Sequence, residues 1–189
     1  MKTPFLRNAV TVSHLLMERH IKTGNIALDA TCGKGNDTLF LAGLVGDRGQ
    51  VYAFDLQAEA IEHTKQKLMQ NNLLNRVKLI NDSHENLNLY INQPIDAAMF
   101  NLGFLPGAES KLVTLPHTTL KAVQQVLTML NHGGLITIVF YPGHRGGQEE
   151  LNIVKDYLIS LPQASFEVSQ LSFINQINNP PQLIAIYKL

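Results

Sequence analysis

The stretch LDATCGKGNDTLFLA, residues 28–42, decides the fold. It begins as the end of a short apolar strand, passes through a loop with two glycines, and opens a helical pattern. Gly33 and Gly35 remove side chains where the chain must turn sharply and approach a ligand. The first turn of the following helix offers backbone N–H groups that have no partner within the helix. The stretch therefore predicts a strand–loop–helix unit with a ligand site in its loop.

The chain on both sides of this unit alternates between strand-like and helix-like patterns. Short apolar runs predict five strands at 26–31, 50–55, 76–81, 95–101 and 135–141. Helical patterns fall at 9–22, 37–46, 58–72, 84–91, 113–131 and 147–160. Strands separated by helices form right-handed parallel crossovers, so we expect a parallel sheet with helices on both faces.

The C-terminal part follows a different pattern. Two strand-like runs, 166–174 and 182–189, have no helix between them, and the intervening NQINNPP is too short for a crossover helix. These two strands are therefore expected to pair antiparallel. The prediction is an α/β, Rossmann-like single domain over residues 1–189. Its mostly parallel seven-stranded sheet ends in a C-terminal antiparallel hairpin and has one reversed edge strand.

Composition limits the classes of function. Lys plus Arg and Asp plus Glu number 15 each in 189 residues, so the net charge is zero. This balance argues against a protein that binds long nucleic acids through a high net positive charge. It allows binding of a short RNA segment through a local basic patch. One cysteine, Cys32, excludes an intramolecular disulfide and argues against a cysteine zinc site. The first 22 residues carry no long apolar run, which predicts a cytoplasmic protein without a membrane span.

The glycine loop alone leaves more than one ligand open. A dinucleotide site would have a third glycine near position 38, where Thr38 stands. A phosphate-binding P-loop would have Ser or Thr after Gly-Lys, but Lys34 is followed by Gly35. Neither pattern is complete, although a nucleotide-dependent oxidoreductase and a non-catalytic nucleotide-binding module remain as alternatives.

Polar residues follow the next two predicted strands. Asp55 ends the second strand about twenty residues past the glycines, where an acid can hold both hydroxyls of a ribose; a helix cap is the alternative. Gln57 could add a polar contact. Asp82, Ser83 and His84 follow the third strand at the same edge of the sheet and are predicted to read an adenine amino group. An N-cap for the short helix near His84 is the alternative there.

Six motifs in order carry a resemblance to a known family: DATCGKGNDT (29–38), FDLQ (54–57), NDSHENL (81–87), FNLGFLPG (100–107), YPGHRGGQEE (141–150) and NNPPQLIAIYK (178–188). They resemble class I methyltransferases and, more narrowly, a small bacterial family of rRNA methylases. That family includes a methyltransferase of 5-(aminomethyl)-2-thiouridine in tRNA. Lys34 stands where this family has asparagine, a departure that leaves the backbone turn intact.

The resemblance implies S-adenosylmethionine as cofactor and no metal. The implied cofactor-binding residues are Asp29, Thr31, Cys32, Gly33, Lys34, Gly35, Asn36, Asp37, Thr38, Asp55, Gln57, Asp82, Ser83, His84 and Asn101. Asn101 would also act in catalysis, since its side chain and a backbone carbonyl of Leu102 or Gly103 could accept hydrogen bonds from an amine. Phe104 could stack on a base. The implied substrate-binding residues are Leu102, Gly103, Phe104, Leu105, Pro106, Arg145 and Glu149.

The motif YPGHRGGQEE adds a second catalytic candidate. Histidine is the usual proton acceptor near neutral pH, so His144 could accept the proton of an alkylammonium substrate, while Arg145 could contact a phosphate. Acids that favour a helix N-terminus are the alternative reading, especially for Glu150. His14 and His117 could reach the pocket. Lys111, Thr114 and Pro116 could form a substrate rim.

The expected function is N-methylation of the 5-aminomethyl group on a tRNA wobble uridine, with the anticodon arm as partner. Methylation of an rRNA or of a small amine is the alternative within the same class. A homodimer would give such a small neutral domain more surface for an anticodon arm. No membrane and no metal partner is expected.

Overall fold

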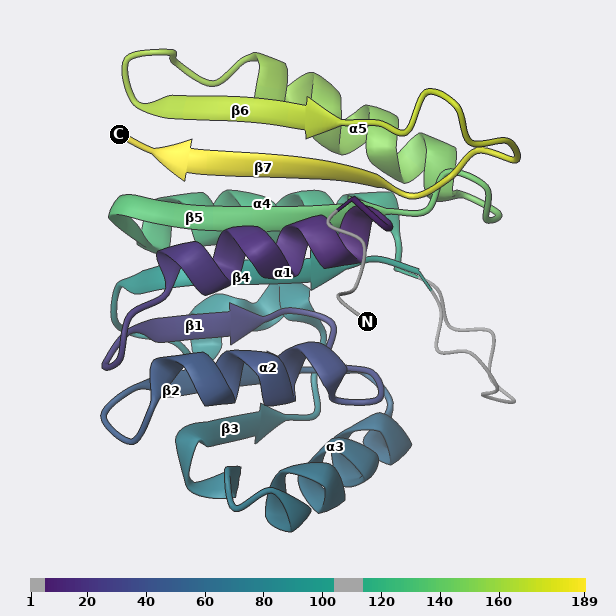
Figure 1. Cartoon of the computed structure of the whole chain (residues 1–189). Helices are drawn as coiled ribbons and strands as arrows, with labels where there is room; N and C mark the ends of the chain where they lie inside the picture. The colour runs from purple at the N-terminus through teal and green to yellow at the C-terminus, as the bar shows by residue number, and fades with distance from the viewer. Residues whose placement is uncertain (1–5, 104–113) are drawn as a thin grey trace.

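A seven-stranded sheet in the order β3-β2-β1-β4-β5-β7-β6 forms the centre of the molecule (Figure 1). The structure is a computed structural model and describes residues 6–103 and 114–189. The strands are β1 (Ile26–Asp29), β2 (Gln50–Phe54), β3 (Val77–Ile80), β4 (Ile95–Asn101), β5 (Leu130–Phe140), β6 (Phe166–Leu171) and β7 (Gln182–Lys188). The predicted mostly parallel, seven-stranded α/β fold is confirmed.

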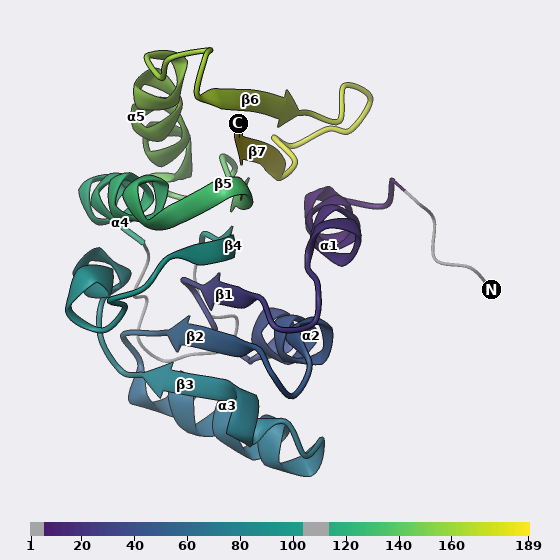
Figure 2. The same cartoon turned by 90° about the vertical axis from the view of Figure 1, so that its left-hand side faces the viewer.

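Helices cover both faces of the sheet (Figure 2). On one face lie α1 (Ala9–His20), α2 (Asn36–Val45) and α3 (Ala58–Gln70). On the other face lie α4 (Pro116–Met129), α5 (Gly147–Ile159) and the 3-10 turns of η2 (His84–Leu89); a short η1 (Leu74–Arg76) precedes β3. The helix predicted at 84–91 is therefore a shorter 3-10 segment.

The order of the parallel strands β1 to β5 reverses direction at β1, in the centre of the sheet. β1 pairs with β2 on one side and with β4 on the other, so Leu28 lies opposite both Tyr52 and Ala98. The chain proceeds outward from β1 in one direction through β2 and β3, and in the other through β4 and β5. Loops that leave β1 and β4 therefore part at the carboxyl edge, which is where open α/β sheets bind ligands.

The C-terminal hairpin is confirmed, but the reversed strand is not at the edge. β7 pairs antiparallel with β5 and with β6, so it lies inside the sheet, and β6 forms the edge. Burial explains this order. β7 buries Leu183, Ile184 and Ile186, whereas the four central residues of β6 are exposed. The more apolar strand takes the covered position because it removes more apolar surface from water.

One predicted boundary is wrong by five residues. The helix expected to reach residue 131 ends at Met129, and β5 begins at Leu130 and not at residue 135. Leu130 pairs with Ile95, and the register shifts between this pair and Ala97–Leu135. Gly133 adopts φ 77°, a left-handed conformation that glycine adopts readily. Because the start of β5 is irregular, the apolar pattern of the sequence does not indicate a strand there.

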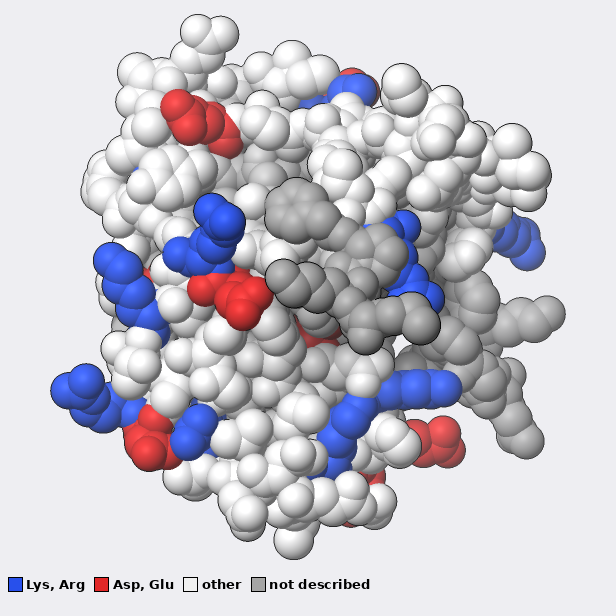
Figure 3. All heavy atoms as spheres, in the orientation of Figure 1, with Lys and Arg blue, Asp and Glu red and all other residues white. Residues whose placement is uncertain are grey.

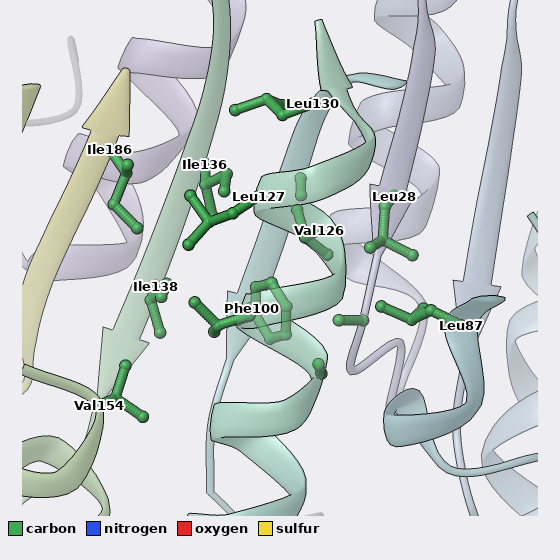
Figure 4. Packing of buried hydrophobic residues seen from close by; sticks show 14 of the residues in the cluster. Leu28, Leu87, Phe100, Val126, Leu127, Leu130, Ile136, Ile138, Val154 and Ile186 are labelled. Carbon is green, nitrogen blue, oxygen red and sulfur yellow. The ribbon is translucent and has the colours of Figure 1, made fainter. Parts of the chain in front are cut away.

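The core consists of apolar side chains on both faces of the sheet. Figure 4 shows part of the cluster under α4 and α5, where Phe100 of β4 lies among side chains from neighbouring strands and from α4. On the opposite face, α1 is fixed by its fully buried Ala9 and Met17 and by a 2.8 Å hydrogen bond from Ser13 Oγ to Thr137 Oγ1 of β5. This buried contact sets where the polar side of α1 lies.

The surface carries no extended region of one charge on the face that Figure 3 shows, where basic and acidic side chains are interspersed. In the described part of the chain, no helix combines the length and apolarity needed to cross a membrane.

Candidate functional site

A cavity of about 740 Å³ opens at the carboxyl edge of the sheet. It is formed by the loops after β1 to β5, by one side of α1 and by the residues around the start of α4. The predicted residues that line it are Thr31, Cys32, Gly33, Lys34, Asn36, Asp37, Asp55, Gln57, Asp82, Ser83, His84, Asn101, Leu102, Gly103 and His144. Its volume is typical of small-molecule sites, which measure roughly 300–1,000 Å³.

Other predicted residues lie elsewhere. Three are buried and do not line the cavity: Asp29, Gly35 and Thr38. Two are exposed and do not line it: Arg145 and Glu149. Phe104, Leu105, Pro106 and Lys111 fall outside the described residues. Of the side chains expected at the rim, Thr114 lines the cavity, and so do both histidines that could reach it, His14 and His117.

The two glycines of the loop serve different purposes. Both have positive φ, 50° at Gly33 and 73° at Gly35. A Cβ on Gly35 would lie 2.8 Å from Thr64 Oγ1 of α3, so this glycine allows the loop to pack on the helix. Gly33 lines the cavity, and its N–H donates to Asp55 Oδ2 at 2.8 Å. Only Gly33 is therefore in a position to approach a ligand.

Asp29 orders the loop from below. Its carboxylate is fully buried and accepts hydrogen bonds from Thr38 Oγ1 at 2.5 Å and from the Thr31 N–H at 3.1 Å. Burial, together with the nearby charge of Asp37, raises the pKa of Asp29 to about 7. Thr38 stands where a dinucleotide loop has its third glycine, and its hydroxyl donates to the Asp29 carboxylate beneath the loop. Cys32 is also buried, and burial raises the pKa of its thiol.

Asp55 follows β2, and its carboxylate connects the loops that leave β1 and β2 through hydrogen bonds. Its Oδ2 accepts from Gly33 N–H, and its Oδ1 accepts from Gln57 N–H at 2.9 Å. The N-cap of α3 is Gln57, and no side chain makes the capping hydrogen bond. The helix-cap alternative for Asp55 is therefore wrong. The carboxylate lines the cavity and keeps the glycine loop beside the second strand.

The residues after β3 combine capping and lining. Ser83 caps η2, since its Oγ accepts from Glu85 N–H at 3.3 Å. Asp82 accepts hydrogen bonds from Tyr90 Oη at 2.8 Å, from Ser83 N–H and from Asn86 Nδ2. The hydrogen bond from Tyr90 is the main cause that lowers the pKa of Asp82. Asp82 is therefore a fixed anionic acceptor at this wall of the cavity.

His84 lies between the ends of β1 and β4. Its Nδ1 is 3.2 Å from the Ala30 carbonyl, and its ring meets Phe100 edge-on with centroids 6.1 Å apart. Burial lowers the pKa of His84, which favours the neutral ring with its proton on Nδ1. Nε2 is buried and has no hydrogen-bond partner among the described atoms.

Asn101 is held by contacts that the sequence did not predict. Its Nδ2 donates to Asp37 Oδ2 at 3.1 Å, and its Oδ1 accepts from Tyr141 Oη at 2.8 Å. The other oxygen of Asp37 lies 2.6 Å from His14 Nε2 of α1. We call His14, Asp37, Asn101 and Tyr141 the Asn101 network. Tyr141 directly follows β5 at the carboxyl edge, and that position was the one signal pointing to it.

The loop after β5 places His144 against Tyr141. The two rings stack at 5.3 Å between centroids with an interplanar angle of 7°. Glu150 lies in the first turn of α5, where an acid favours the helix N-terminus, as the alternative interpretation predicts. Its side chain, however, does not face solvent. It is 3% exposed and accepts from Thr119 Oγ1 at 2.6 Å and from Thr114 Oγ1 at 3.1 Å. Burial raises the pKa of Glu150.

The charged side chains that line the cavity fit a positively charged nucleoside cofactor. Among the described residues, the carboxylates that line it are Asp37, Asp55, Asp82 and Glu85, and the lysine is Lys34. S-adenosylmethionine carries a sulfonium and an ammonium group, which such a lining favours, and a ribose diol that a carboxylate can receive. Within the described residues, no group of three or more His, Cys, Asp or Glu is placed to hold a metal ion.

Comparison with known proteins defines the class. A structure from Streptococcus mutans in complex with SAH shares 40% identity and a TM-score of 0.89, covering 97% of this chain and 99% of that one. A structure from Clostridium thermocellum with the description "putative rRNA-methylase" shares 44% identity and a TM-score of 0.95 over 97% and 99% of the two chains. With this fold and this cavity, the chain is a class I S-adenosylmethionine-dependent methyltransferase. The oxidoreductase and the non-catalytic module are no longer alternatives.

The family follows from sequence. The family described as "Putative rRNA methylase" matches residues 51–187, and the chain belongs to it. The chain is also similar to the chloroplastic tRNA (mnm(5)s(2)U34)-methyltransferase of Arabidopsis thaliana, at 36% identity over 96% of this chain and 70% of that protein.

Proposed function

We propose that this single domain N-methylates the 5-aminomethyl group of the wobble uridine in the anticodon arm of a tRNA. The observation that carries the proposal is Asn101, which lines the cofactor cavity at the end of β4 with its amide fixed on both sides. The name of the plant relative supports the substrate, since that protein is described as a tRNA methyltransferase for the mnm(5)s(2)U34 position.

In this proposal, the amide oxygen of Asn101 receives one N–H of the amine. A backbone carbonyl receives the other, and Leu102 is the better candidate because the Gly103 carbonyl accepts from Thr114 N–H at 3.4 Å. S-adenosylmethionine supplies an electrophilic methyl group on a positively charged sulfur. Two acceptors on the amine orient its lone pair, and such orientation can contribute several kcal/mol to a displacement, up to about 7–11 kcal/mol in the best intramolecular cases.

His144 is the proposed acceptor of the amine proton. It lines the cavity and is held by the stacking contact with Tyr141 and by its backbone N–H, which donates to the Tyr141 carbonyl at 3.0 Å. Asn101 cannot accept a proton at neutral pH, so positioning and proton transfer fall to different residues. Arg145, exposed next to His144 in the chain, is the proposed phosphate contact.

The direct test is nucleoside mass spectrometry. Total tRNA from a deletion strain should accumulate 5-aminomethyl-2-thiouridine, and purified protein with S-adenosylmethionine should convert it to the methylated nucleoside. Normal wobble nucleosides in the deletion strain, together with methylation of rRNA by the purified protein, would refute the tRNA proposal in favour of the rRNA alternative. Light scattering in the same preparation tests the predicted homodimer, and cell fractionation tests the predicted cytoplasmic location.

A further inference from the structure

The Asn101 network joins four separate elements across the floor of the cavity. His14 comes from α1, Asp37 from α2, Asn101 from β4, and Tyr141 from the residue after β5. We propose that Asp37 and Tyr141 are positioning residues that fix which end of the Asn101 amide is the hydrogen-bond acceptor, with His14 holding Asp37 in place. The proposal rests on the proposed function for what the amide oxygen receives, but not for how the amide is held.

The orientation of an amide is a chemical problem because its two ends have almost the same shape. The oxygen accepts hydrogen bonds and the nitrogen donates them, so a flipped Asn101 would present a donor to an amine substrate. An ionised carboxylate can only accept, so the end that faces Asp37 Oδ2 at 3.1 Å must be the NH2 group. The oxygen then faces Tyr141 Oη, which donates at 2.8 Å.

Tyr141 keeps the proton that this arrangement needs. Burial, together with the charge of Asp37, raises the pKa of the Tyr141 phenol, so its hydroxyl stays a donor. An amide oxygen has two acceptor sites, and Tyr141 uses one of them. The oxygen can therefore receive an amine N–H while it remains bonded to Tyr141, and the amide cannot flip without breaking two hydrogen bonds at once.

The first helix completes the network. His14 Nε2 lies 2.6 Å from Asp37 Oδ1, and its ring stacks on Phe40 of α2 with centroids 4.2 Å apart and an angle of 8°. The neighbouring Ser13 bonds to Thr137 beneath the helix. Asp37 is 6% exposed and receives hydrogen bonds on both oxygens, so it cannot rotate away from Asn101 without losing His14.

The activity test uses Asp37→Asn and Tyr141→Phe, which keep shape and remove one property each. An amide at position 37 can donate as well as accept, so it no longer selects one orientation of Asn101. For both variants we expect kcat at saturating cofactor to fall roughly 10- to 100-fold. In Tyr141→Phe, which keeps every carboxylate of the cavity, the Kd for SAH by calorimetry should change less than about 2-fold. An unchanged kcat at saturating cofactor in Asp37→Asn would overturn the proposal, since Asp37 would then act on the cofactor alone and not on Asn101.

Asp96→Asn is the matched control. Asp96 lies on the same strand as Asn101 and accepts from Ile26 N–H and Asn131 Nδ2, both at 2.8 Å, at the opposite end of the sheet. The same carboxylate-to-amide change there should lower stability and leave kcat unchanged. A loss of kcat as large as that of Asp37→Asn would mean that any weakening of β4 slows the enzyme, and would overturn the positioning role.

A stability cycle tests the network without methyl transfer. Asn101→Asp places a carboxylate 3.1 Å from Asp37 and should lower the Tm by roughly 5–15 °C, because two carboxylates then face each other in a partly buried site. The swapped double variant, Asp37→Asn with Asn101→Asp, restores one donor facing one acceptor and should recover most of that loss. A double variant no more stable than the sum of the single changes would overturn the proposal. If wild-type protein fails to methylate the aminomethyl tRNA, the proposed function fails, and this cycle still decides how Asn101 is held.

Discussion

Replacing Asp55 by alanine should separate cofactor binding from folding. Each carboxylate oxygen of Asp55 already accepts one backbone N–H, from Gly33 or from Gln57. A carboxylate oxygen has two acceptor sites, so one site per oxygen remains for the two hydroxyls of a ribose. Hydrogen bonds to a charged group contribute about 1.5–3 kcal/mol each. Loss of both should weaken binding of S-adenosylmethionine at least 100-fold, at about 1.4 kcal/mol per tenfold.

The same substitution should have a modest effect on the fold. Two backbone N–H groups at a partly exposed site lose their partner, which we expect to cost about 1–3 kcal/mol and to lower the Tm by about 2–4 °C per kcal/mol. Glu59→Ala is the matched control, since it removes an exposed carboxylate from the first turn of α3 outside the cavity lining. Calorimetry with S-adenosylmethionine gives the Kd, and circular dichroism gives the Tm. Wild-type affinity in a folded Asp55→Ala variant would refute the ribose assignment.

Three further predictions concern pH, proton transfer and RNA. Because the folded-state pKa of Asp29 is about 7 against an ordinary 3.8, its contribution to stability is fully present below about pH 4 and is lost as the pH rises toward 7. Urea unfolding between these pH values should show a smaller decline in Asp29→Asn, and an equal decline would contradict the assignment. His144→Ala should lose about 10²–10⁴-fold in rate near neutral pH and regain activity at high pH, where the amine deprotonates by itself; an unchanged pH–rate profile would mean that water accepts the proton. Arg145→Ala should reduce the salt dependence of binding to an anticodon stem-loop by about one unit of log–log slope at unchanged cofactor affinity, and an unchanged slope would exclude a phosphate contact.

The order of elements and most of the cavity lining could be predicted from the sequence. Strand and helix periods are local properties, and residues at the carboxyl ends of parallel strands must meet at one edge. The failures occurred where the deciding neighbour is distant in the chain. The position of β7 depends on which of two apolar strands is better covered, and the start of β5 depends on pairing with Ile95.

The roles of single polar residues were harder to predict. Asp29 and Asp37 both belong to the glycine loop and the start of its helix, yet one turns beneath the loop and the other toward Asn101. His14 lies 23 positions before Asp37, and Tyr141 lies 40 positions after Asn101, so nothing local indicates these contacts. Glu150 has the sequence position of a surface acid, but its buried carboxylate accepts hydrogen bonds from two threonine hydroxyls.

The central position of β1 sets a lower limit on the piece of chain that can function. The family match begins at residue 51, after β1 and after the glycine loop. A fragment that begins there would leave β2 and β4 with unpaired edges in the middle of the sheet, where each now pairs with β1. Such edges invite pairing with other chains, so the fragment should aggregate and could not bind cofactor. The segment before residue 51, which the family match leaves out, is therefore required to join the two halves of the sheet.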